Sequence, residues 1–447
     1  MSGPIKAEQF ADWAYYPELL ARPVPRYTSY PTAAEFVEES FELRQRISLG
    51  ALTGPVSIYL HIPYCEEICW YCGCNTGAAN KRHRLTAYLE ALHREIALVA
   101  DMLDPSVHIE HIAFGGGSPN AVPPTEFVRL IDALVLAFRF VRPALSVELD
   151  PRTLTRDWLT AIRGIGVTRV SLGVQTLNPA VQEAIGRVQP IEMIETAVAG
   201  LRAAGVGSIN FDLMYGLPHQ DDAVLAETLA QSARMGPDRI ALFGYAHVPH
   251  MIPRQRRIDG SDLPDQRGRF RMAARGARQL MDAGYQAVGF DHFALPDDPL
   301  ARAARSGTLR RNFQGFTEDP ASTLIGLGAS AISEMPGLMV QNEKNPGRYR
   351  MLIGADQLAG RKGLETTAED ARRAALIEAL LCKGAAKIDA DLLNAVRSRL
   401  EPFAAVGLVS LERGWLRLEA GAAPYARAIA AVFDAYRSEE RSFSSAI

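Results

Sequence analysis

The chain has 447 residues, of which 48% are hydrophobic and 22% are charged, which is typical of a folded globular protein. Lysine and arginine total 48 against 51 for aspartate and glutamate, and a net charge of −3 gives no general attraction to nucleic acid. No run of about 18 apolar residues occurs and nothing at the start resembles a secretory signal, so we expect a cytoplasmic protein that does not enter membranes.

Residues 1–50 are expected to form an N-terminal arm. The arm contains the aromatic sequence RYTSYPTA, which runs from Arg26 to Ala33. One interpretation is that this arm packs Tyr27 and Tyr30 onto the main domain and does nothing more. The other is that the arm covers an open active site.

Six short β-branched runs alternate with helical stretches from residue 57 to about residue 250. They read SIYLHI (57–62), HIEHIAFG (108–115), LSVELD (145–150), RVSLGVQ (169–175), INFDLMYG (209–216) and RIALFGYA (239–246). The first two are separated by a stretch, residues 86–103, in which apolar side chains recur every three or four residues: Leu89, Leu92, Ile96, Val99 and Leu103. That spacing predicts one buried helix face. Strands and helices in alternation predict a parallel sheet.

Each predicted strand ends in residues that are unusual for a packed sheet. They are a cysteine-rich loop and the sequences GGGS, ELDP, GVQ, FDLMYGLP and YAH. In β/α barrels the active site lies at the carboxyl ends of the strands. A closed eight-stranded barrel fills its interior with side chains, whereas six strands splayed open admit a large flat substrate. We therefore predict an α/β fold, a partial (β/α)6 TIM-like barrel, with its active site at this rim.

The barrel is expected to span residues 51–290. Residues 291–360 are expected to complete the barrel and cover the substrate. The remainder, 361–447, is predicted to be a helical domain with a winged-helix-like hairpin, LVSLERGWLRLE, that turns at Arg413-Gly414. With this charge balance we interpret the hairpin unit as a packing module or a lid.

Four of the five cysteines lie within ten positions of one another. They are Cys65, Cys69, Cys72 and Cys74, while Cys382 lies in an apolar helical run and is expected in the core. A disulfide framework suits short secreted chains. Structural zinc usually takes two ligand pairs from separate loops. Clustered free thiols without a ligand are prone to oxidation. An iron–sulfur cluster is the remaining interpretation.

The spacing C-x-x-x-C-x-x-C supports that interpretation. It allows Cys65, Cys69 and Cys72 to hold one face of a cubane [4Fe–4S] cluster and leaves the fourth iron without a protein ligand. We assign these three thiols as ligands and leave Cys74 unassigned.

Two further motifs stand at strand ends. In FGGGSP, three glycines and Ser118 allow backbone groups to approach the charged end of a ligand, although the sequence also suits a tight turn. It is not a phosphate-binding loop of the Walker type, because Pro119 and Asn120 follow where Lys-Ser/Thr is required. In SVELDP, strand alternation places Glu148 and Asp150 on one face, where they need a cationic ligand or a salt bridge with an arginine such as Arg152.

The cysteine loop, written CEEICWYC, resembles that of the radical S-adenosylmethionine (SAM) superfamily. Its flanking residues Tyr59, His61, Ile62 and Pro63, the extra Cys74 and later segments are similar to those of the oxygen-independent coproporphyrinogen III oxidase family, from about residue 22 onward. The resemblance implies oxidative decarboxylation of two propionates of coproporphyrinogen III to vinyl groups by a 5′-deoxyadenosyl radical, which gives protoporphyrinogen IX in haem biosynthesis. It also implies the partial barrel.

The resemblance implies two bound SAM molecules. Positions that match those binding the first are Tyr59, Gly116, Glu148 and Ile332. Positions that match those binding the second are Tyr71, Gly117, Ser118, Gln175, Arg187, Asp212 and Ala246. Ser118 replaces the more usual threonine of the family and keeps the hydroxyl.

The substrate carries four propionates, so its pocket needs cations, and our candidates are Arg26 and Arg311. The family often ends in Phe-Ser-Arg, but this chain has Ser445 at the arginine position, so no role is carried over to it. We expect a monomer that takes electrons from a donor such as flavodoxin or ferredoxin and passes them to an unknown acceptor.

Three alternatives stay open at this point. Relatives with the same loop serve as haem-binding chaperones, but those generally lack both RYTSYPTA and the equivalent of Cys74. A related radical SAM enzyme that acts on haem is the second. A zinc-bearing winged-helix regulator is the third, and iron and sulfide analysis would separate it from the others.

Overall fold

Six parallel strands form the centre of the fold. The computed structural model describes residues 8–10, 12–79, 82–138 and 140–437. Each strand predicted from the sequence is present and pairs in parallel with the next one along the chain. They are β4 (Pro55–Ile62), β7 (His108–Gly116), β8 (Phe140–Leu149), β9 (Arg169–Gln175), β10 (Ser208–Tyr215) and β11 (Arg239–Gly244).

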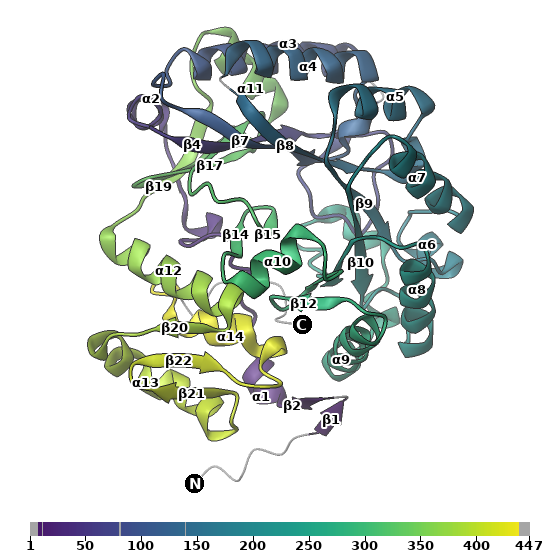
Figure 1. Cartoon of the computed structure of the whole chain (residues 1–447), viewed down its shortest axis with the longest axis vertical. Coiled ribbons are helices and arrows are strands. Elements are labelled where there is room, and N and C mark those ends of the chain that lie inside the picture. The colour runs from purple at the N-terminus through teal and green to yellow at the C-terminus, as the bar shows by residue number, and fades with distance from the viewer. Residues whose placement is uncertain (1–7, 11, 80–81, 139, 438–447) are drawn as a thin grey trace.

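The sheet continues beyond both ends of this parallel set. Next to β4 lies β16 (Leu324–Leu327), parallel to it, followed by the antiparallel strands β17 (Ile332–Met335), β18 (Leu338–Asn342), β19 (Gly360–Glu365) and β3 (Val37–Glu38). Next to β11 lie β13 (His292–Ala294) and β12 (Gln286–Val288), also antiparallel. Within the described residues the outermost strands, β3 and β12, do not pair with each other. The curved sheet is thus an open partial barrel, as predicted (Figure 1).

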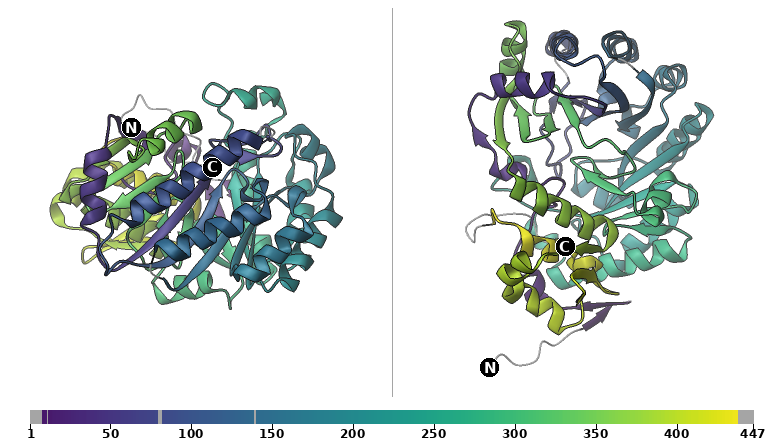
Figure 2. Two further views of the ribbon diagram at one scale, coloured as in Figure 1. Left: turned by 90° about the horizontal axis from the view of Figure 1, so that it is seen from above. Right: turned by 60° about the vertical axis from the view of Figure 1, so that its left-hand side comes forward.

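Helices cover the outer face of this curve (Figures 1 and 2). They are α3 (Arg82–Ala100), α4 (Pro124–Ala137), α5 (Arg156–Ile165), α6 (Pro179–Ala184), α7 (Ile191–Ala203), α8 (Asp222–Arg234) and α9 (Gln266–Asp282), with α2 (Glu42–Gly50) and α11 (Pro346–Gly354) near the β19 side. The predicted apolar face of α3 is buried, but the helix ends at Ala100, so Leu103 lies beyond it. Polar caps start several helices; the Thr155 hydroxyl, for example, accepts from the Trp158 amide at the start of α5.

A hairpin fills part of the space inside the curve. It consists of β14 (Arg310–Asn312) and β15 (Gly315–Thr317), and it follows α10 (Pro299–Ser306). Figure 1 shows it surrounded by the strands of the main sheet. The segment that follows β15 therefore brings side chains from residues 317–319 to the interior of the barrel.

The two ends of the chain pack together below the barrel. The C-terminal part contains α12 (Ala368–Lys383), β20 (Ala385–Lys387), α13 (Ala390–Ala405), β21 (Val409–Glu412), β22 (Trp415–Leu418) and α14 (Ala426–Ala430). The predicted hairpin is confirmed, with φ of 49° at Arg413 and 77° at Gly414, and β20 adds a third strand to it. The N-terminal part contains β1 (Glu8–Phe10), β2 (Trp13–Tyr15) and α1 (Pro17–Leu20), and the Tyr16 amide donates to the Tyr425 hydroxyl at 2.8 Å.

The RYTSYPTA arm packs against the C-terminal segment. The Tyr27 hydroxyl donates to Asp434 Oδ2 at 2.9 Å, and the Tyr30 hydroxyl accepts from the Ala435 amide at 3.0 Å. Both tyrosines are buried. The arm therefore ties its two aromatic anchors to the end of the chain.

Other features expected from the sequence can be located in the fold. Cys382 is buried in α12, as expected for a core thiol. Ser445 lies outside the described residues. No helix in the described ranges has both the length and the apolar character needed to span a bilayer. The division into four domains stays a prediction, although the sheet takes strands from all four predicted segments.

Candidate active site

The carboxyl ends of the six parallel strands surround one cavity of about 540 Å³. Each strand contributes lining residues from its end or from the loop that follows. Most of the residues predicted from the sequence line it: Arg26, Cys65, Cys69, Tyr71, Cys72, Gly116, Gly117, Ser118, Glu148, Gln175, Arg187, Asp212 and Ala246. Segments that are up to 220 residues apart in sequence thus meet at the predicted rim.

Three predicted residues do not line this cavity. Tyr59 lies on β4, and its hydroxyl is hydrogen-bonded to His61 Nδ1 at 3.2 Å. Ile332 opens β17, two strands away from β4 in the sheet. Arg311 lies on β14 and donates to the backbone carbonyls of Tyr27 at 3.1 Å and Arg26 at 3.2 Å. Arg311 therefore holds the N-terminal arm in place.

The cysteine loop is held in position by backbone contacts. The Trp70 amide donates to the Ile185 carbonyl at 3.0 Å, and the Gln255 side chain donates to the Tyr71 carbonyl at 2.8 Å. Arg254 donates to the Cys74 carbonyl at 2.9 Å. The two neighbouring aromatic residues of the loop lie in different places. Tyr71 lines the cavity, while Trp70 lies against Gly186.

The thiols of the loop influence one another. Burial, followed by the neighbouring Cys72 and Cys69, raises the pKa of Cys65 to about 12. The opposite holds at Cys72, where hydrogen bonding from Cys74 lowers the pKa to about 6. The Cys74 amide lies 3.4 Å from Cys72 Sγ. Cys74, which the sequence left unassigned, is thus the hydrogen-bonding partner of a predicted ligand.

The donor set fits a cubane cluster. Cys65, Cys69 and Cys72 are free thiols that line the same cavity. Within the described ranges no three Cys, His, Asp or Glu side chains are grouped as a site for one metal ion. A cubane gives each thiolate an iron of its own, so its ligands stand around the cluster and do not converge on one point.

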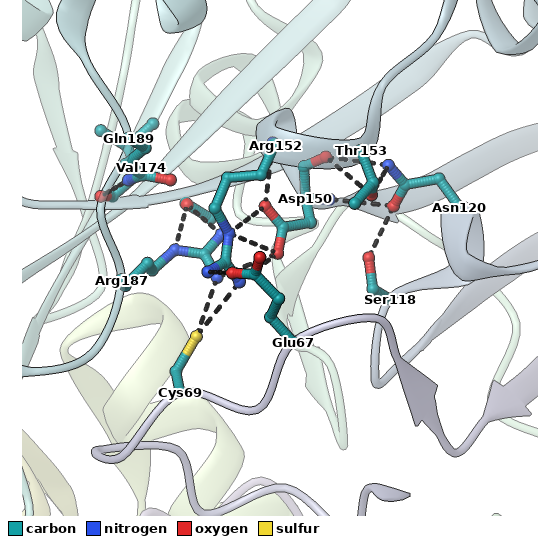
Figure 3. A network of polar contacts seen from close by, with 11 residues as sticks. Glu67, Cys69, Ser118, Asn120, Asp150, Arg152, Thr153, Val174, Arg187 and Gln189 are labelled. Carbon is teal, nitrogen blue, oxygen red and sulfur yellow. Dashed lines mark hydrogen bonds and ion pairs between the residues drawn. The ribbon is translucent and has the colours of Figure 1, made fainter. Parts of the chain in front are cut away.

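Cys69 is also the acceptor in a network of arginines (Figure 3). Its sulfur accepts from Arg152 Nη2 and from Arg187 Nη1, both at 3.3 Å. The same two guanidinium groups form ion pairs with Asp150 at 2.7 and 3.2 Å, and Arg152 reaches Glu67 at 2.6 Å. These N–H groups fix the direction of the sulfur, as hydrogen bonds to a metal ligand from neighbouring side chains do.

Asp150 is therefore not available to a ligand. Its pairing with Arg152 is the salt bridge that the sequence left as an alternative. Although burial opposes ionisation, Arg187 and Arg152 hold the pKa of Asp150 below its ordinary value. The backbone of Asp150 is fixed by Asn120, which accepts from its amide at 3.0 Å and donates to its carbonyl at 2.8 Å.

The glycine motif is closely approached by groups of the protein itself. A Cβ on Gly115 would lie 2.6 Å from the Glu148 carboxyl group, and one on Gly116 would lie 2.3 Å from the His61 ring. A Cβ on Gly117 would lie 2.4 Å from the Tyr64 carbonyl oxygen. The glycines are required because the protein's own groups approach the backbone, while Gly116 and Gly117 still line the cavity.

Glu148 and Asp212 are two buried carboxyl groups in the cavity wall. Glu148 accepts from the Gly116 amide at 3.2 Å, and Asp212 accepts from Ser171 at 2.8 Å and Asn210 at 2.9 Å. Burial, followed by the charge of Asp212, raises the pKa of Glu148 to about 7. Burial likewise raises the pKa of Asp212. This part of the wall favours a cationic ligand, because a nearby positive charge would favour ionisation of both groups.

Sequence reasoning missed several residues of this site. From the sequence, Arg152 is expected only as a salt-bridge partner. Asn120 serves only to exclude a phosphate-binding loop, and Glu67 is not singled out. Arg152 and Asn120 directly follow recognised motifs, and Glu67 lies inside the cysteine motif. The only available signal was that closeness in sequence, because their partners come from other strands.

Comparisons with known proteins agree with this geometry. The profile of the Radical SAM superfamily matches residues 59–231. Oxygen-independent coproporphyrinogen III oxidase of Bradyrhizobium diazoefficiens is 43% identical, over 92% of this chain and 94% of that protein. The protein of the same name from Paracoccus denitrificans is 38% identical, over 95% and 96%. The solved structure of coproporphyrinogen III oxidase (HemN) from Escherichia coli, described as a radical SAM enzyme, superposes with a TM-score of 0.90 at 34% identity and covers 96% of this chain and 100% of that one.

Proposed function

Because the chain belongs to the oxygen-independent coproporphyrinogen III oxidase family of the radical SAM superfamily, we propose that it oxidatively decarboxylates two propionates of coproporphyrinogen III. Each decarboxylation releases one molecule of carbon dioxide and leaves one vinyl group on the tetrapyrrole. The product is protoporphyrinogen IX, and the reaction is a step of haem biosynthesis. The observation that carries the proposal is the meeting of three free thiols with two uncompensated carboxyl groups on one cavity.

The proposed ligands of a [4Fe–4S] cluster are Cys65, Cys69 and Cys72. When bound, the reduced cluster and SAM supply the one-electron chemistry that removes hydrogen from an unactivated C–H bond. Arg152 and Arg187 donate to the Cys69 sulfur and fix its direction. The residue set leaves one iron for a ligand other than protein.

We propose two SAM sites from the residues that the family resemblance assigns. The first is formed by Tyr59, Gly116, Glu148 and Ile332, and the second by Tyr71, Gly117, Ser118, Gln175, Arg187, Asp212 and Ala246. In the first, Glu148 is the partner of a cationic group of SAM, which would keep this carboxyl group ionised at neutral pH. In the second, Asp212 has the same role.

Arg26 is proposed to donate to a substrate propionate, because it lines the cavity. Arg311 would support it indirectly, since Arg311 donates to the Arg26 carbonyl and so fixes the arm. A small electron carrier such as flavodoxin or ferredoxin is the proposed donor. The acceptor is unknown. We propose that the protein is a monomer and that it lies in the cytoplasm, where thiolates and iron stay reduced.

The test is an anaerobic incubation of iron- and sulfide-reconstituted protein with SAM, a reductant and coproporphyrinogen III. We expect two molecules of carbon dioxide for each substrate converted, and we expect Cys69→Ala to lose both bound iron and vinyl formation. The matched control is Cys382→Ala, which removes a thiol in α12 outside the cavity and should retain iron and activity. Formation of 5′-deoxyadenosine with an unchanged tetrapyrrole would refute the proposed reaction.

A further inference from the structure

A second, smaller cavity adjoins the first. Its volume is about 60 Å³, and it shares Arg26, Phe243 and Ala246 with the large cavity. Arg269 of α9 and Arg427 of α14 also line it. Three guanidinium groups from the N-terminal arm, a barrel helix and the C-terminal part thus meet beside the end of β11.

Among the described residues that line this cavity, three are arginines and one, Asp291, is acidic. The Asp291 carboxylate is hydrogen-bonded to His292 Nδ1 at 2.6 Å. Arg269 Nε is buried and has no hydrogen-bond partner in the described part of the chain. A buried donor that lacks an acceptor is costly, so an entering anion would be stabilised.

Two of these guanidinium groups lie over aromatic rings of the wall. The Arg26 guanidinium lies over the Phe243 ring at 5.5 Å, and that of Arg427 lies over the Phe290 ring at 5.7 Å. Burial, followed by the charge of Arg26, lowers the pKa of Arg427 to about 10. Arg26 and Arg427 are thus close enough to repel each other, and an anion between them would reduce that repulsion.

The size and walls of the cavity define the anion. At about 60 Å³ against about 540 Å³ for the large cavity, it suits a side chain of the substrate and not the tetrapyrrole body. Its walls are apolar at Leu242, Phe243, Phe290 and Phe293 and cationic at the arginines. This combination suits a carboxylate on a short methylene chain, whereas inorganic phosphate has no methylene groups for the aromatic walls.

We propose that Arg269 and Arg427, together with Arg26, bind the carboxylate of a propionate that does not react. The inference rests on the proposed function, and it names the part of the substrate that fixes its orientation. None of the cysteines of the loop lines the small cavity, so a carboxylate held here is kept away from the cluster. The tetrapyrrole body lies in the large cavity and reaches the small one past the shared residues.

The test is fluorescence titration of the reconstituted, SAM-loaded full chain with two porphyrins. Coproporphyrin III carries four propionates, and mesoporphyrin IX carries only the two that correspond to the non-reacting ones. We expect Arg269→Gln to weaken the binding of both by the same factor, about 10- to 100-fold, because a charge-assisted hydrogen bond to a buried carboxylate is lost. Arg269→Lys should recover part of the loss.

The control is Arg275→Gln, also on α9, whose guanidinium pairs with Asp222 at 2.6 Å outside both cavities. It should bind both porphyrins like the wild type. A loss for coproporphyrin alone would place a reacting propionate here and overturn the inference, as would wild-type binding of both by Arg269→Gln. Failure of the proposed function is distinct, because the wild-type protein would then form no vinyl groups.

Discussion

Both edges of the parallel sheet contain charged side chains, and the edges differ in how these charges are paired. At the amino edge two arginines share one carboxylate. There Arg169 begins β9 and Arg239 begins β11, and both pair with Glu318 Oε1, at 2.7 and 3.0 Å. At the carboxyl edge, Glu148 and Asp212 face the cavity, and no ion pair within the described residues includes either of them.

The pKa values express this difference. Burial opposes ionisation of Glu318, but Arg169 and Arg239 lower its pKa to about 2. Burial and Asp212 raise the pKa of Glu148 to about 7. Charges at the amino edge are therefore arranged for stability, and those at the carboxyl edge are arranged for a ligand, as expected for the two faces of a β/α barrel.

The largest expected effect is at the carboxyl edge. Glu148→Gln keeps the shape of the side chain and an acceptor for the Gly116 amide but removes the charge that we propose to pair with SAM. We expect vinyl formation to fall by about 100-fold or more, because an interaction between buried charges is lost, while stability to urea is unchanged or rises. Glu192→Gln, exposed on α7, is the control. Near-normal turnover in Glu148→Gln would show that the carboxyl edge is not prepared for a cation.

The converse change is Glu318→Gln at the amino edge. It leaves two largely buried guanidinium groups without their shared carboxylate. We expect a loss of about 2–3 kcal/mol in unfolding free energy, at the lower end for a buried pair because the Glu318 side chain is 29% exposed. Activity per folded molecule should stay close to that of the wild type. Unfolding in urea and a turnover assay at low temperature measure the two quantities; an unchanged urea midpoint would contradict the role assigned to this edge.

The two edges should also respond to pH in opposite directions. Glu148 binds its proton more tightly in the folded state than in the unfolded state, where the pKa is 4.5, so its contribution to stability falls as pH rises from 4.5 to about 7. Glu318 has the lowered pKa, so its contribution is present above 4.5 and is lost as pH falls toward 2. Glu148→Gln should therefore gain stability relative to the ligand-free wild type between pH 5 and pH 7.5. Parallel urea midpoints for the two proteins across that range would argue against a raised pKa.

The smallest effect is expected far from both edges. Arg413 has φ of 49° in the two-residue turn of the β21–β22 hairpin, and Gly414 follows with φ of 77°. Asn-Gly suits such a turn better than Arg-Gly, so Arg413→Asn should stabilise the protein by about 0.5 kcal/mol and leave turnover unchanged. Thermal unfolding provides the measurement. A change in turnover would mean that this C-terminal hairpin communicates with the cavity.

The sequence predicted the barrel well because the spacing of apolar residues and the order of strands and helices can be seen in short stretches of the chain. The β-branched runs, the apolar spacing of α3 and the turn at Arg413-Gly414 are all visible in short windows, and the structure contains each of them. The outer strands β16 to β19 were not identified as strands. They are short, and β16 joins the sheet by pairing with β4, which is far away in the chain.

The candidate site shows the same division. The cysteine loop and the GGGS motif were found from spacing, and most of the assigned residues line the cavity. The partners of those residues were not found. Nothing near Cys69 in sequence indicates that Arg152 and Arg187 donate to its sulfur. Nor does any pattern unite Arg26 with Arg269.

The sequence by itself therefore determined the donor set, the alternation of strands and helices, and the edge of the sheet at which chemistry takes place, because each depends on residues a few positions apart. Tertiary structure alone decided which charges are neutralised and which are left for a ligand. Asp150 and Glu148 are two residues apart on one strand end, yet only Asp150 meets arginines. Burial and the approach of a distant partner set the energy of a charge, and neither is a property of the local sequence.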